Sequence, residues 1–143
     1  MKKISQQFRD LACLMAIAIC IIGCGGSSDQ PELGQVKGKV TLDGQPVADA
    51  TVFFWPADGG RTVSTTTDAN GDYELKYVGD DKGTKVGKNK VRVSTQRDGD
   101  SDEDGNPTEP RKETIPAKYN TETQLEFDVT PGENVINLEL TSD

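Results

Sequence analysis

The amino-acid sequence predicts an all-β fold, a β-sandwich of about seven short strands in antiparallel sheets. From Gln35 onward, apolar and polar residues alternate over short runs, and no run shows a helical period. Gly, Pro, Asn and Asp separate these runs at the intervals typical of sandwich turns. After its N-terminal segment the chain keeps about 110 residues, enough to bury one core between two sheets.

The first strand is expected from residue 35, with faces of opposite polarity. Val36 and Val40 would lie on one face, and Lys37 and Lys39 on the other. Residues 43–46 (DGQP) are typical of the turn that would end it.

Residues 50–55 form the most apolar run, with large side chains on both faces of the expected strand. This favours a strand covered on both sides, which Pro56 would end. Phe53 and Trp55 could alternatively form an aromatic platform for sugar rings, but the apolar character of the run favours core packing. The polar, β-branched residues 61–67 suit an outer strand.

The Asn70-Gly71 pair lies between two strand-like runs and predicts a β-hairpin. Tyr73, Leu75 and Tyr77 alternate with charged residues in the run that follows. Residues 79–89, rich in Gly and Lys, are expected to form a loop.

The remaining strands follow the same alternation. Residues 90–95 would place Val91 and Val93 inward, and the acidic segment 96–112 is expected to be a long solvated loop. Residues 115–120 would lead into a strand around Phe127, and residues 131–134 are typical of a turn before the last strand. The apolar residues of these last two strands are Leu125, Phe127, Val129, Ile136, Leu138 and Leu140.

The N-terminal segment has the pattern of a secretory signal. Lys2, Lys3 and Arg9 precede an apolar run that ends at Ile22 and is shorter than the roughly 20 residues a spanning helix needs. Gly23 and Cys24 follow, and this stretch resembles the lipobox of bacterial lipoproteins, in which the Cys is lipidated and becomes the mature N-terminus.

This resemblance predicts three parts. Residues 1–23 would be the signal peptide, 24–34 the lipidated Cys24 with a flexible tether, and 35–143 the β-sandwich domain. The protein would be anchored to a membrane by its lipid, on the periplasmic or cell-surface side.

Composition excludes several classes of function. The chain has a formal net charge of −8, which argues against nucleic acid as a partner. It contains no His, the usual general base at neutral pH and the commonest transition-metal ligand. With Cys24 lipidated and the other two Cys removed with the signal, no thiol nucleophile remains, so we expect no enzymatic activity.

Three segments together resemble carboxypeptidase regulatory-like domains, which share a transthyretin-like (prealbumin-like) sandwich. They are 38–52 (GKVTLDGQPVADATV), 67–75 (TDANGDYEL) and 86–94 (VGKNKVRVS). The third departs from the family, which usually has an aromatic residue at the position of Asn89 or Lys90. Residues 115–120 and 131–134 resemble the tail of small bacterial lipoproteins built from one such domain. The resemblance implies a non-catalytic domain.

The acidic loop offers one candidate metal site. Asp100, Asp102 and Asp104, followed by Gly105, match the D-x-D-x-D-G start of a calcium loop, and Asp98 lies beside them. The twelfth position is Arg111 in place of the bidentate Glu, although Glu109 or Glu113 could substitute. The alternative is a solvated acidic loop that holds no cation.

The sequence therefore leads us to expect a lipid-anchored, non-enzymatic extracytoplasmic protein with a structural or interaction role. Its partners would be the membrane and an envelope protein or cell-wall polymer. The second hypothesis is a calcium-dependent binding or adhesion module that uses Asp98–Asp104.

Overall fold

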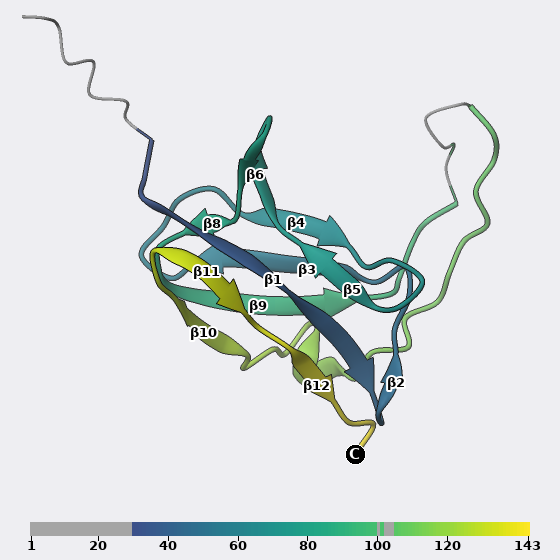
Figure 1. The fold of residues 1–143 in the computed structure, drawn as a ribbon. Helices are drawn as coiled ribbons and strands as arrows, with labels where there is room; N and C mark the ends of the chain where they lie inside the picture. Colours follow the sequence, from purple (N-terminus) through teal and green to yellow (C-terminus); the bar gives the residue numbers. More distant parts are fainter. Residues whose placement is uncertain (1–29, 100, 102–104) are drawn as a thin grey trace, which may run out of the picture. The chain divides into compact units, whose positions relative to one another are not determined.

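The computed structural model describes residues 30–99, 101 and 105–143, and Pro31–Asp143 form one compact unit. The described residues contain twelve strands and one short 3₁₀ helix, η1 (Ala117–Tyr119) (Figure 1). This confirms the all-β sandwich. The strands outnumber the expected seven because several have only two or three residues, too few to show an alternation. No helix in this part of the chain is long and apolar enough to cross a bilayer.

The first sheet is built around one long central strand, β1 (Leu33–Leu42). It begins two residues before the expected domain start at Gln35. On one side it pairs in parallel with β11 (Gly132–Val135) and then β12 (Leu138–Leu140). On its other side it pairs antiparallel with three short strands: β8 (Thr84–Lys85), β5 (Asp72–Glu74) and β2 (Gln45–Pro46).

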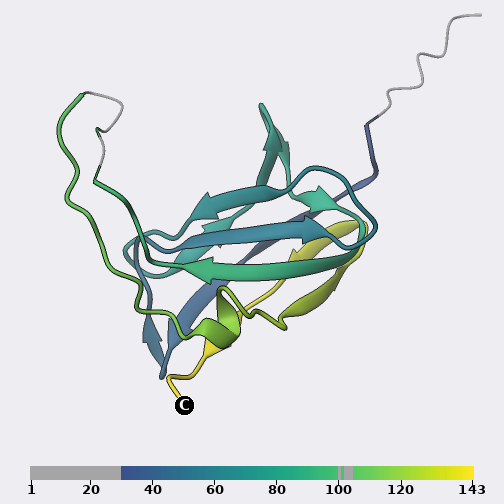
Figure 2. The same cartoon turned by 180° about the vertical axis from the view of Figure 1, so that it is seen from behind.

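The second sheet has four antiparallel strands, in the order β10-β9-β3-β4 (Figure 2). Their bounds are β10 (Glu126–Val129), β9 (Gly87–Ser94), β3 (Thr51–Pro56) and β4 (Val63–Thr66). A separate two-stranded ribbon, β6 (Lys76–Val78) with β7 (Asp81–Lys82), projects from the body (Figure 1).

The core lies between the two sheets. Every second side chain of the long strands is buried there, as the alternation predicts: Val36 and Val40 from β1, Val52 and Phe54 from β3, and Val91 and Val93 from β9. Tyr73 of β5 packs its ring 6.3 Å from that of Phe54 and so connects the sheets through the core.

The Asn-Gly turn forms as predicted, but the hairpin does not. Asp68 Oδ1 accepts hydrogen bonds from the backbone N–H of Asn70 (2.8 Å) and of Asp72 (3.0 Å), and Gly71 has a φ of +79°. The strands on either side belong to different sheets, since β4 pairs with β3 and β5 pairs with β1. The turn therefore carries the chain from one sheet to the other.

Strand β3 is fully covered on one side only, which corrects the expectation that both faces would be covered. Val52 and Phe54 are fully buried, whereas Phe53 and Trp55 on the opposite face are half-buried. Core packing was therefore the wrong interpretation of these two aromatic residues, because their face of the sheet points away from the core.

Two segments predicted as loop or turn contain strands. Residues 79–89 hold β7, β8 and the start of β9, and β11 occupies most of the turn expected at 131–134. Asn89 explains part of the first difference. Its buried amide nitrogen donates to the carbonyls of Lys85 and Gly87, both at 2.9 Å, and so fixes the tight connection between β8 and β9.

Candidate functional site

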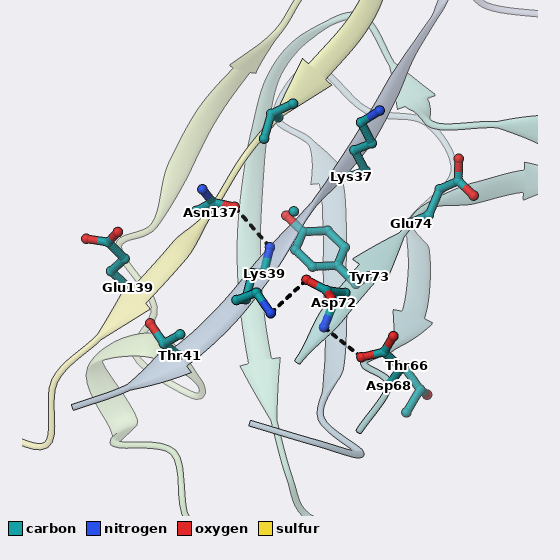
Figure 3. Close-up of a pocket in the computed structure, with 12 residues that line it drawn as sticks. Lys37, Lys39, Thr41, Thr66, Asp68, Asp72, Tyr73, Glu74, Asn137 and Glu139 are labelled. Atoms are coloured by element: carbon teal, nitrogen blue, oxygen red, sulfur yellow. Dashed lines mark hydrogen bonds and ion pairs between the residues drawn. The ribbon is translucent and has the colours of Figure 1, made fainter. Parts of the chain in front are cut away.

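An open groove of about 660 Å³ lies on the outer face of the first sheet. Its floor is β1, which presents Lys37 and Lys39 (Figure 3). Asp72 and Glu74 of β5 line one side, and Glu139 of β12 lies on the other. These side chains point outward because the alternate residues of β1 and β12 fill the core.

A break between β11 and β12 shapes the floor of the groove. The N–H of Ile136 donates to the Lys37 carbonyl (2.8 Å), but its own carbonyl accepts from the Tyr73 hydroxyl (2.8 Å). The N–H of Lys39 donates instead to Asn137 Oδ1 (3.1 Å). At Gly38 a Cβ atom would collide with the Ile136 carbonyl, so only glycine allows this close approach.

Several charged groups in and around the groove are already paired. Lys37 lies 2.9 Å from Glu133, Lys39 lies 3.0 Å from Asp72, and Lys82 lies 2.8 Å from Glu74. The hydrogen bond from Lys82 lowers the pKa of Glu74, and the bond to Glu133 raises the pKa of Lys37. Both shifts keep the groups charged at neutral pH.

Tyr73 is also unsuited to proton transfer. Burial raises the pKa of its phenol, and its proton is used in the bond to Ile136. The pKa values of Tyr73, Glu74 and Lys37, the groove residues with resolved shifts, are thus moved away from the neutral range in which an acid–base group works. The arrangement suits a polar surface that contacts a partner.

The predicted calcium ligands are only partly within the structure. Asp98 is exposed, and Asp100, Asp102 and Asp104 lie outside the described residues, as does Cys24. Among the residues that are described, no group of three potential ligands converges. The calcium hypothesis and the lipidation of Cys24 therefore stay predictions.

The two residues nearest to completing a calcium loop have other roles. Arg111 donates from its guanidinium to the carbonyl of Ala48 (3.1 Å), and its backbone pairs with that of Arg97. Glu113 is unavailable as a substitute ligand because its carboxylate accepts hydrogen bonds from six donors.

Those six donors make Glu113 the fixed point at the base of the long loop. They come from Ser94 and Thr95 at the end of β9 and from Thr114, Ile115 and Asn120 beyond the loop. Partial burial opposes ionisation, but the hydrogen bonds outweigh it and lower the pKa of Glu113 from 4.5 to about 2. Sequence reasoning missed this role, since Glu113 is one of many acidic residues in that region.

No protein-family model and no characterised protein matches this chain. Among solved structures it is similar to a 9R-lipoxygenase from Cyanothece, with 18% identity, a TM-score of 0.43, and coverage of 79% of this chain and 17% of that one. It is also similar to the major pilin subunit of Bacillus cereus, with 14% identity, a TM-score of 0.45, and coverage of 79% and 31%. The chain spans less than a third of either protein, and the likeness concerns the arrangement of strands alone.

Proposed function

We propose that this protein is a lipid-anchored, non-enzymatic domain with a structural or interaction role on the extracytoplasmic side of a membrane. The observation that carries the proposal is the pairing of charges in the groove. Both of its lysines pair with acidic groups, as in the Lys39–Asp72 pair, and the resolved pKa shifts hold Glu74 and Lys37 in their charged forms. Such a surface can contact a partner, and the pKa shifts of Glu74 and Lys37 move these two groups away from proton exchange at neutral pH.

The proposed family is the carboxypeptidase regulatory-like domain with its transthyretin-like sandwich. Two packed sheets, and a tight turn at Asp68–Asp72 that passes between them, support this proposal. The chain departs from the family at the position of Asn89 or Lys90, where an aromatic residue is usual, and Asn89 instead makes buried hydrogen bonds to the carbonyls of Lys85 and Gly87.

The proposed anchor is Cys24, preceded by Gly23 and a short apolar run. Two or three acyl chains on one residue would hold the protein at a bilayer stably, because each buried CH₂ contributes about 0.8 kcal/mol. The domain would then face the aqueous side, with its acidic surface in solvent.

Membrane fractionation of a bacterium that expresses the full chain tests this proposal. We expect the unaltered protein in the membrane fraction, with a diacylglyceryl mass on the peptide that begins at Cys24. The Cys24→Ser variant should lose both, and Cys20→Ser, a matched change inside the apolar run, should keep both. Acylation that survives Cys24→Ser, or an unaltered protein found free of lipid in the soluble fraction, would refute the anchor.

A further inference from the structure

The outer face of the four-stranded sheet carries two aromatic residues directly across from two cations. In the register of β3 with β9, Phe53 lies opposite Arg92 and Trp55 lies opposite Lys90. All four side chains point away from the core, because the residues between them, Val52, Phe54, Val91 and Val93, are fully buried. The result is two aromatic–cation pairs, about 6–7 Å apart along the strands.

Arg92 is positioned by its aromatic partner. Its guanidinium carbon lies 4.3 Å from the centroid of the Phe53 ring, within the range of a cation–π contact. Its Nε is buried and has no hydrogen-bond partner within the described residues. The planar group is therefore held by stacking, and its terminal nitrogens remain available to a carboxylate.

Five lysines of the described residues form ion pairs, and Lys90 and Arg92 are not among the paired cations. Neither forms an ion pair with any described residue, in a molecule of net charge −8. Glu126 of β10 lies across from Lys90 in the sheet, but its carboxylate binds Lys88 at 2.9 Å. Lys88 also lies 3.9 Å from Asp128, so it offsets part of the acidic edge of this face, and the aromatic part keeps two unpaired positive charges.

We propose that this face binds an anionic polysaccharide, with sugar rings stacked on Phe53 and Trp55 and their carboxylates held by Arg92 and Lys90. Each aromatic–cation pair offers one apolar surface and one positive charge, and the two pairs repeat along the strand. A polymer of acidic sugars repeats the complementary features, because each sugar carries a ring and a carboxylate. An acidic peptide would satisfy the cations but has no flat apolar ring at each charge.

The inference rests on the proposed function, because a domain anchored outside the cytoplasm meets envelope polymers of this kind. It specifies the class of partner and moves the contact from the groove of the first sheet to the outer face of the second. Failure of the Cys24→Ser test would remove the anchor, but it would leave a binding measurement on purified protein interpretable.

Trp55 is the only tryptophan of the chain, so its fluorescence reports binding at this face directly. The full-length protein in detergent would be titrated with polygalacturonate, with its fully methyl-esterified form, and with poly-L-glutamate. These probes carry charge and sugar rings, sugar rings without charge, and charge without sugar rings. We expect polygalacturonate to change the Trp55 emission at a concentration at least tenfold lower than either of the other two polymers. Added salt should weaken the binding of polygalacturonate.

Substitutions then assign the binding to the two unpaired cations. Arg92→Gln and Lys90→Gln should each weaken polygalacturonate binding about tenfold, which corresponds to about 1.4 kcal/mol. Lys88→Gln removes the same charge from the same face, but that charge is already paired with Glu126, so we expect less than a twofold change. An unchanged thermal midpoint would show that each variant is folded.

Four results would overturn the proposal. Trp55 emission that does not respond to polygalacturonate at low salt would mean that the face binds no such polymer. Equal affinity for poly-L-glutamate would show that the face recognises charge alone. Equal affinity for the methyl-esterified polymer would show that charge plays no part in binding. A loss in Lys88→Gln as large as that in Arg92→Gln would show general electrostatic attraction.

Discussion

The carboxylate of Glu113 holds the two ends of a long loop together. Segment 96–112 leaves the sandwich after β9 and returns just before Glu113, whose oxygens bind donors on both sides of the loop. The antiparallel backbone pair of Arg97 and Arg111 closes the loop immediately above. The base of the loop is therefore fixed by its own hydrogen bonds.

We expect Glu113→Gln to destabilise the fold by about 1–3 kcal/mol at pH 7, since an amide brings two donors toward groups that are themselves donors. The pH dependence has a definite sign. The folded pKa of Glu113, about 2, lies below its ordinary value of 4.5, so its contribution is complete above pH 4.5 and is lost as the pH falls toward 2.

Urea unfolding at several pH values measures both effects. The unaltered protein should lose stability across that acid range, and the variant should lose less. Glu109→Gln is the matched control, because Glu109 is an exposed acid of the same loop. An identical acid response in the protein and its Glu113→Gln variant would show that other carboxylates set the pH dependence.

Tyr73→Phe removes one buried hydroxyl and leaves the Ile136 carbonyl without its donor. We expect a loss of about 1–2 kcal/mol, the usual effect of leaving a buried acceptor unpaired. Tyr77→Phe is a suitable comparison, since Tyr77 is half-buried and contacts Arg61 through its ring. Chemical denaturation of the two variants should separate them, and equal midpoints would mean that the hydroxyl contributes nothing to the break between β11 and β12.

Among the elements, the turn at Asp68–Asp72 decides how the two sheets connect. Asp68→Ala removes the acceptor for two backbone N–H groups and should cost about 1 kcal/mol. Asp80→Ala, an exposed change in the turn of the projecting ribbon, should be close to neutral. Thermal unfolding compares them, and a neutral Asp68→Ala would show that Gly71 alone sets the turn.

The same turn marks the limit of prediction from sequence. Asn70 and Gly71 identify a tight turn because their chemistry is local, but nothing local tells whether the strands on either side pair with each other. Alternation placed Val36, Val40, Val91 and Val93 in the core correctly, since the pleat fixes which residues share a face. It could not reveal β7 and β8, which are two residues long.

The candidate surfaces were harder to foresee than the fold. The groove depends on β5 and β12 lying on either side of β1, and the aromatic face depends on the register of β3 with β9. Both are contacts between residues far apart in the sequence. The sequence marks Phe53 and Trp55 as a candidate platform, but composition alone favours the core because the run that contains them is so apolar.

At the scale of the whole molecule, the first and last strands complete the same sheet. Val40 lies beside Leu138 and Leu42 beside Leu140, so the core closes only when the end of the chain has joined β1. A fold with such long-range pairing is expected to form slowly, in milliseconds to seconds.

Removal of residues 138–143 should therefore abolish cooperative unfolding. Leu138 and Leu140 are each 2% exposed, and losing one buried leucine costs about 2–5 kcal/mol out of a total stability of roughly 5–15 kcal/mol. Removal of residues 142–143 alone removes an exposed hydrogen bond from Ser142 to Asp43 and should leave the cooperative unfolding transition intact. Calorimetry of the two truncated chains distinguishes these outcomes, and a cooperative transition without β12 would contradict the dependence on closure.

The parallel pairing of β1 with β12 has a mechanical consequence. The chain enters the sandwich at Leu33, at one end of this pair, and leaves after Leu140, at the other end (Figure 1). Tension between these two points pulls the strands along their length, and the hydrogen bonds that cross between them resist together rather than opening one after another. The unit is therefore built to withstand a pull from its two ends.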